Sequence, residues 1–233
     1  MSIADIKPLD CIFFKGTEVV SEAIVELEKI TLGIGEWSHV GLVVNREVIP
    51  NLNVKDDDLY IWESTISSKY PLITSDPTLD AESTEPVFGV QLRKLKDVVK
   101  NSLRTGVKIG WGRLKNNPIY PLPHESKEES EKRIQKIKTT LDRVHSQNYH
   151  RPYEKNICRL FSAVFTYFSC CRSSCCIGDD WVFCSQFVAI VYEAIGVLSK
   201  VYDPEIVLPQ DLATPSYSGE HLPDILDQVV YIQ

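Results

Sequence analysis

The segment 37–44 (WSHVGLVV) constrains the fold more than any other, because it combines a strong β-strand pattern with a histidine. It is rich in β-branched residues and is bounded on both sides by turn-forming residues. Successive side chains of a strand alternate between its two faces, so His39, Gly41 and Val43 share one face. A polar ring among apolar neighbours needs a partner. It is either a core histidine bonded to a backbone carbonyl or a base that activates another group.

Apolar periodicity predicts the remaining elements of the chain. Period-two patterns and apolar runs predict further strands at residues 10–14, 59–65, 87–92, 107–114 and 228–232. Helical spacing predicts helices from about residue 17 and at residues 95–103, 125–144, 156–168 and 184–198. A proline-marked loop is expected at residues 204–215, and insertions are expected at residues 67–86 and 116–176. No repeat or domain boundary is visible in 233 residues, so we expect one domain over residues 1–233.

Cys184 stands at the first position of the predicted helix 184–198, whose inward face is expected to include Ala194 and Leu198. A thiol at a helix N-terminus faces free backbone N–H groups and the positive end of the helix dipole, and both favour the thiolate. The same N–H groups could stabilise an oxyanion during acyl transfer. The alternative is a small buried residue at the start of a core helix.

Glu63 lies on the predicted strand 59–65 (LYIWEST) and shares a face with Ile61 and Thr65. A carboxylate there could orient an imidazole and hold its tautomer, or it could simply face solvent from a half-exposed strand. None of the three residues is specific alone. A strand histidine, a carboxylate on a second strand and a cysteine opening an apolar helix are together the groups that papain-like enzymes use.

The order of these groups and several segments carry a resemblance to a known family. Papain-like chains run cysteine, histidine and then the orienting residue, whereas this chain runs His39, Glu63, Cys184. The matching segments are LDCIFFK, WSHVGLVV, YIWEST, GVQLRKL, FCSQFVAIVYEAIGVL and VLPQDL. With these, the chain resembles the circularly permuted branch of the NlpC-type papain-like superfamily. That branch includes bacterial YiiX/YaeF-like hydrolases, a poxvirus virion protein family and, more distantly, lecithin:retinol acyltransferase relatives.

The resemblance implies both a fold and a chemistry. The fold is an α+β, circularly permuted papain-like domain in which an antiparallel sheet packs against the cysteine-bearing helix, with helical insertions. Cys184 would be the nucleophile, His39 the general base and Glu63 the orienting residue of a hydrolase acting on amide or ester bonds of peptide- or lipid-linked substrates. No cofactor and no metal are implied. The alternatives are an acyltransferase on the same fold and a noncatalytic virion or structural module.

Charge and hydropathy limit the partners and the location. The net charge of −7 argues against nonspecific nucleic-acid binding, which needs a basic surface. No apolar run approaches the roughly 18–20 residues that span a bilayer. The opening MSIADIKPLD lacks the basic and apolar regions of a signal peptide. We therefore expect a cytoplasmic protein, membrane-associated or virion-packaged in some settings, and the sequence predicts no oligomeric state.

Four of the seven cysteines crowd into one short segment, at Cys170, Cys171, Cys175 and Cys176. They could bind zinc, although adjacent cysteines chelate less well than C-x-x-C pairs. They follow an apolar segment, so S-acylation there could attach the protein peripherally to a membrane. The third interpretation is a loop of reduced thiols. Cys11 and Cys158 are expected in the core.

Overall fold

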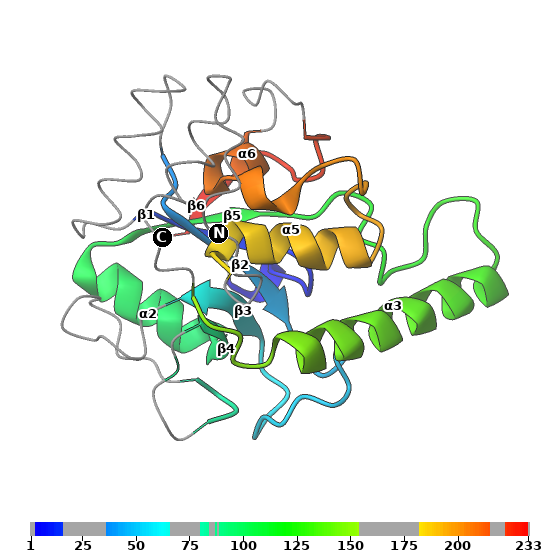
Figure 1. The fold of residues 1–233 in the computed structure, drawn as a ribbon, viewed down its shortest axis with the longest axis horizontal. Coiled ribbons are helices and arrows are strands. Elements are labelled where there is room, and N and C mark those ends of the chain that lie inside the picture. The colour runs from blue at the N-terminus through cyan, green and yellow to red at the C-terminus, as the bar shows by residue number, and fades with distance from the viewer. Residues whose placement is uncertain are drawn as a thin grey trace, which may run out of the picture.

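The computed structural model describes residues 3–15, 36–65, 80–83, 87, 89–153, 182–214 and 222–232. The strands are β1 (Cys11–Lys15), β2 (His39–Val44), β3 (Tyr60–Thr65), β4 (Gly89–Lys94), β5 (Lys108–Gly112) and β6 (Val230–Ile232). The helices are η1 (Ile3–Asp5), α2 (Leu95–Thr105), α3 (Lys127–Asn148), α5 (Cys184–Ala194), η3 (Pro204–Ile206) and α6 (Pro209–Ala213) (Figure 1). The helices predicted from residue 17 and at 156–168, together with the four clustered cysteines and Cys158, lie outside the described residues.

The six described strands form one sheet in the order β4-β3-β2-β1-β5-β6, and every neighbouring pair is antiparallel. All six strands expected from the sequence therefore exist, with ends displaced by a few residues. The α+β class and the antiparallel sheet are confirmed.

Alternation along the central strands divides the core into two layers. Val40, Leu42 and Val44 of β2 are buried in a cluster that also contains the apolar side of α5. Val43 of β2 is buried on the other side, together with residues of α2 such as Val98. The sheet thus lies between α5 and α2, with α5 resting on β2 and β3 (Figure 1). This placement brings the first residue of α5 to the sheet.

Two predictions in the C-terminal part were wrong. Helix α5 ends at Ala194 rather than at residue 198, because Gly196 adopts φ 78° and closes the helix, as a glycine past a helix end commonly does. Ala194 is consequently exposed instead of facing inward. The expected loop 204–215 contains η3 and α6, each with a proline in its first turn, where the missing N–H costs nothing.

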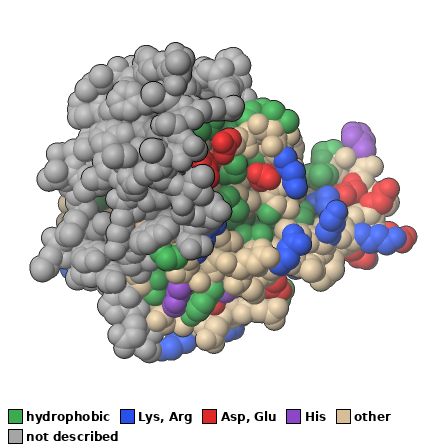
Figure 2. Space-filling model, in the orientation of Figure 1, with side chains coloured by type: hydrophobic (Ala, Val, Ile, Leu, Met, Phe, Trp, Pro, Cys, Tyr) green, Lys and Arg blue, Asp and Glu red, His purple; other side chains and the backbone are tan. Residues whose placement is uncertain are grey.

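Helix α3 begins in a capping box formed by Ser126 and Glu129 and continues four residues beyond the predicted end. Its narrow apolar stripe packs toward α5 through Ile137, Leu141 and Val144. Its outer surface carries acidic and basic side chains interspersed (Figure 2). Among the helices that the structure describes, none combines the length and the apolarity that crossing a bilayer requires.

Candidate active site

The hydrogen-bonded pairing of strands β2 and β3 ends near the start of α5, which leaves an opening in the ladder there. Their pairing runs from Val44 opposite Tyr60 to Leu42 opposite Trp62 and goes no further, although β3 continues to Thr65. The Val43 N–H bonds toward β1, so the alternate N–H groups of β2, including that of Val40, point toward β3. The Val40 N–H therefore has no strand partner on that side and is directed into the opening.

The start of α5 is fixed in this opening by hydrogen bonds to the surrounding chain. The Ser64 hydroxyl of β3 donates to the Val182 carbonyl at 2.7 Å, and the Val182 N–H donates to the Pro152 carbonyl at 3.0 Å. One turn further, the Ser185 hydroxyl donates to the Val207 carbonyl at 2.7 Å. These contacts hold Cys184, which is 5% exposed, at the first position of the helix.

The Cys184 sulfur lies among groups that stabilise a negative charge. The His39 side chain and the backbone N–H groups of Val40 and Ser185 lower the pKa of the Cys184 thiol by hydrogen bonding. The N-cap residue Phe183 provides no side-chain acceptor for the first-turn N–H groups of α5. Burial alone would raise the pKa of the Cys184 thiol. Attraction to the His39 ring and these hydrogen bonds outweigh it, so the pKa lies below its ordinary value.

His39 bonds to Cys184 on one side and to Glu63 on the other. Its Nε2 contacts Glu63 Oε2, so Nδ1 is the nitrogen left for the thiol. Phe14 packs against the His39 ring, with ring centroids 5.5 Å apart, and the His39 side chain is 19% exposed. Burial favours the neutral ring, but the charges of Cys184 and Glu63 and the bonds to both raise the pKa of His39 to about 10.

Glu63 is completely buried, which excludes a solvent-facing position for it. Its Oε1 accepts from the Arg93 side chain at 2.6 Å, and Oε2 faces His39. Burial raises the pKa of Glu63, whereas the Arg93 and His39 charges lower it, and the net result lies below the ordinary value. Because Gly41 has no side chain, it leaves room beside this carboxylate. A Cβ added to Gly41 would lie 3.4 Å from Glu63 Oε2.

The three residues proposed from the sequence therefore lie together, with His39 bonded to Glu63 and interacting with the Cys184 thiol. A thiolate paired with an imidazolium, which a buried carboxylate holds in one orientation, can attack an electrophilic carbon, and the imidazolium can give a proton to the leaving group. Sequence reasoning missed Arg93, the Val40 N–H and the Ser64 hydroxyl. These groups lie beside the trio because of the register between the strands, which the sequence does not specify. Alternation on β4 indicates only that Arg93 shares a face with Gln91.

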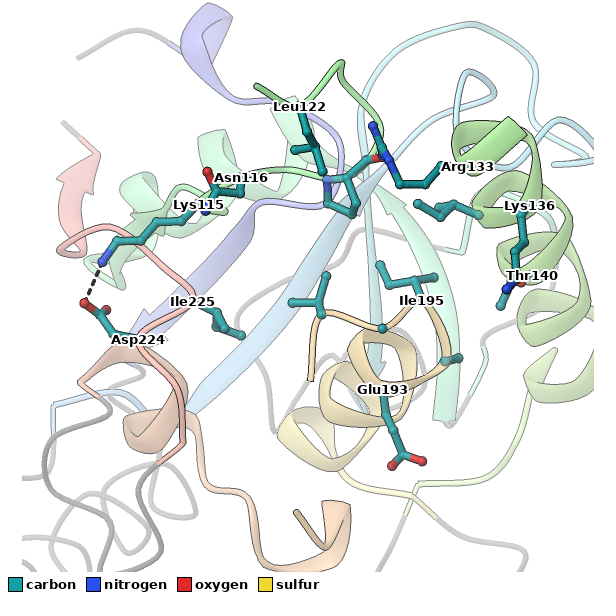
Figure 3. A pocket seen from close by; sticks show the side chains of 15 residues that line it. Lys115, Asn116, Leu122, Arg133, Lys136, Thr140, Glu193, Ile195, Asp224 and Ile225 are labelled. Atoms are coloured by element: carbon teal, nitrogen blue, oxygen red, sulfur yellow. Dashed lines mark hydrogen bonds and ion pairs between the residues drawn. The ribbon is translucent and has the colours of Figure 1, made fainter. Parts of the chain in front are cut away.

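A cavity of about 600 Å³ lies elsewhere, at the C-terminal end of α5 between α3 and the segments around Lys115 and Asp224 (Figure 3). An 11-residue helix is ~16 Å long, so this cavity is well removed from Cys184 at the other end of α5. Lys115 pairs with Asp224 and Arg133 pairs with Glu125, which leaves these polar groups engaged with each other. We therefore place the candidate site at Cys184 and not in the cavity.

Among the described residues, no group of three or more histidine, cysteine or acidic side chains is arranged to hold a metal ion. No protein-family model matches the sequence, and no curated protein matches it either. Among solved structures, the chain is similar to the crystal structure of the metalloprotein YiiX from Escherichia coli O157:H7. The two share 16% identity with a TM-score of 0.41, over 97% of this chain and 96% of that chain. A likeness at this level supports no inference about activity.

Proposed function

We propose that this chain is a cysteine hydrolase of permuted papain-like fold that cleaves amide or ester bonds, with Cys184 as nucleophile, His39 as general acid–base and Glu63 as orienting residue. The observation that carries the proposal is the pairing of the Cys184 thiol with His39 at the N-terminus of α5. A structural cysteine needs no such partner. Cys11 illustrates the contrast, because burial raises the pKa of its thiol to about 12 and its contact is the Tyr192 hydroxyl.

The proposed reaction follows from these positions. The Cys184 thiolate attacks the carbonyl carbon and forms a C–S bond, while the carbonyl oxygen takes the negative charge. As that charge returns to form the carbonyl, the C–N or C–O bond breaks and His39 gives its proton to the leaving amine or alkoxide. Water then attacks the thioester while His39 removes its proton, and the acid product leaves Cys184 as thiolate beside a protonated His39.

The start of α5 supplies the groups for the oxyanion. Backbone N–H groups of the first helical turn have no acceptor within the helix, and the macrodipole adds to their effect. Removal of one such donor typically slows acyl transfer by about 10²–10³-fold in enzymes that use them. The Val40 N–H, which contacts the sulfur, is a further donor on the sheet side.

Acyl transfer from activated esters tests the proposal. We expect 4-nitrophenyl acetate and 4-nitrophenyl octanoate to acylate Cys184, with a burst of nitrophenol and a mass increase located on the Cys184 peptide. The Cys184→Ala variant should lose the burst, and His39→Ala should slow both acylation and hydrolysis of the thioester. Cys11→Ala, which removes the other described cysteine, should behave as wild type.

Two outcomes decide between the hydrolase, the acyltransferase and the noncatalytic alternative. A burst of equal size in Cys184→Ala and in the wild type would refute Cys184 as the nucleophile, and the absence of any burst from the wild type would favour the noncatalytic alternative. If added primary amines or lysolipids intercept the thioester in preference to water, the chain is an acyltransferase on the same fold. The acyl-chain preference between acetate and octanoate then indicates whether lipid-linked or short substrates are favoured.

A further inference from the structure

Arg93 contacts the proposed site through Glu63 and has no direct contact with Cys184 or His39 among those that the structure describes. It lies on β4 opposite Ile61, which makes it a diagonal neighbour of Glu63 across the β3–β4 pair. Its side chain is 3% exposed and that of Glu63 is fully buried, so the two charges are removed from solvent together. An isolated buried charge is costly, and burial of both requires a close pair.

The contact divides the two oxygens of Glu63 between two partners. Arg93 approaches Oε1 with both Nε and Nη2 at 2.6 Å, whereas Oε2 bonds to His39 Nε2. The planar guanidinium presents its donors in a fixed geometry, which a lysine ammonium cannot reproduce. Arg93 thereby fixes which oxygen, and which orientation of the carboxylate, is offered to the imidazole.

We propose that Arg93 is a positioning residue of the reactive centre: it fixes the Glu63 carboxylate against His39 and begins a row of alternating charges, Arg93⁺–Glu63⁻–His39⁺–Cys184⁻. This inference rests on the proposed function of Cys184 and extends it. The alternation matters because each charge in a buried row stabilises the opposite charge beside it. The row thus makes the thiolate–imidazolium state the stable one near neutral pH.

Neutralising single members of the row should shift its titration in opposite senses. Arg93→Gln removes a cation from the row, so Cys184 should take up a proton more readily and its thiolate should form about one pH unit higher. Glu63→Gln removes the anion beside His39, so the His39 imidazolium should lose its proton at lower pH than in the wild type. Arg93→Lys keeps the charge but not the forked geometry and should lie between Arg93→Gln and the wild type.

The experiment is a thiolate titration by absorbance at 240 nm, recorded for each variant against the same variant carrying Cys184→Ala. The His39 ring is followed in parallel by NMR of histidine-labelled protein. Lys96→Gln is the matched control, because it removes a cation three residues from Arg93 that pairs with Asp58 at the surface. We expect this control to titrate as wild type.

A double variant keeps the test valid if a single one folds poorly. Arg93→Gln with Glu63→Gln removes both buried charges, which is less costly than leaving one unpaired. If Arg93 acts through Glu63, its loss should shift the thiolate titration much less in the Glu63→Gln background than in the wild type. Equal shifts in both backgrounds, or no shift with Arg93→Gln, would overturn the role of Arg93 and leave the proposed function intact. A wild-type Cys184 that titrates like an ordinary thiol would overturn both.

Discussion

Gly41 lies directly against Glu63, on the strand next to it: a Cβ added to Gly41 would sit 3.1 Å from Glu63 Cβ and 3.4 Å from Oε2. The same Cβ would overlap with the Ile61 side chain, which is completely buried and branched at its own Cβ. Glycine at this position therefore makes room for the carboxylate that orients His39.

Gly41→Ala should accordingly impair both stability and reactivity. Overpacking of a tight core costs about 1–3 kcal/mol, which urea unfolding can measure. Displacement of Glu63 from His39 should also slow alkylation of Cys184 by iodoacetamide. Gly112→Ala is the control, because its Cβ would meet Leu226 and Phe13 at 3.1 Å, the distance at which the Gly41 Cβ would meet Glu63 Cβ, and lies away from the three site residues. We expect it to lose stability without slowing alkylation, and an equal loss of alkylation in both variants would contradict a specific effect.

The two described cysteines should differ strongly in reactivity. Cys184 has a lowered thiol pKa and a histidine partner, whereas the pKa of Cys11 is raised to about 12 and its sulfur contacts the Tyr192 hydroxyl at 3.1 Å. Because the thiolate is the nucleophile, iodoacetamide near pH 7.5 should modify Cys184 first, by a factor of ~100 or more. Peptide mass spectrometry over a time course measures both rates. His39→Ala should slow Cys184 and leave Cys11 unchanged.

Much of this arrangement could be predicted from the sequence, and the exceptions have physical reasons. Period-two patterns located β2 and β3, and with them His39 and Glu63, because one-residue alternation is a local property. Arg93 could not be assigned, because an arginine alternating with apolar residues is equally typical of a solvent-facing strand position. Its burial depends on the register of β3 against β4, which a long insertion separates in sequence. The end of α5 at Gly196 was predictable from the glycine signal and was missed.

Glu63 should make the protein less stable in acid. Its pKa is lower in the folded state than in the unfolded chain, so its contribution is complete above the unfolded value of about 4.3. That contribution is lost as the pH falls through the folded value. Urea unfolding between pH 3 and 6 should therefore give a steeper decline for the wild type than for Glu63→Gln.

The same variant should also be less stable at neutral pH, by about 3–5 kcal/mol, since it breaks the buried ion pair between Arg93 and Glu63. Glu131→Gln, at an exposed position of α3, provides the control. It should match the wild type both in its free energy of unfolding and in how that free energy changes with pH. A Glu63→Gln curve parallel to that of the wild type below pH 5 would show that this carboxyl does not titrate with a lowered pKa.

Ser64 links the proposed orienting strand to the proposed nucleophile, because it follows Glu63 on β3 and its hydroxyl donates to the Val182 carbonyl at 2.7 Å. Both ends of this bond are buried. Ser64→Ala removes the donor and leaves the Val182 carbonyl without it, at a cost of about 1–3 kcal/mol. The larger expected effect is on position, because this bond holds α5 where the β2–β3 ladder has ended.

A small displacement of Cys184 from His39 and from the Val40 N–H should weaken the stabilisation of the thiolate, so alkylation of Cys184 should slow several-fold in Ser64→Ala. Ser146→Ala, at an exposed position of α3 where the hydroxyl bonds to the Asp142 carbonyl, is the matched substitution and should alter neither rate nor stability appreciably. Thermal unfolding separates the two contributions. A Ser64→Ala protein that loses stability but keeps the wild-type alkylation rate would show that the opening between β2 and β3 positions α5 without this bond.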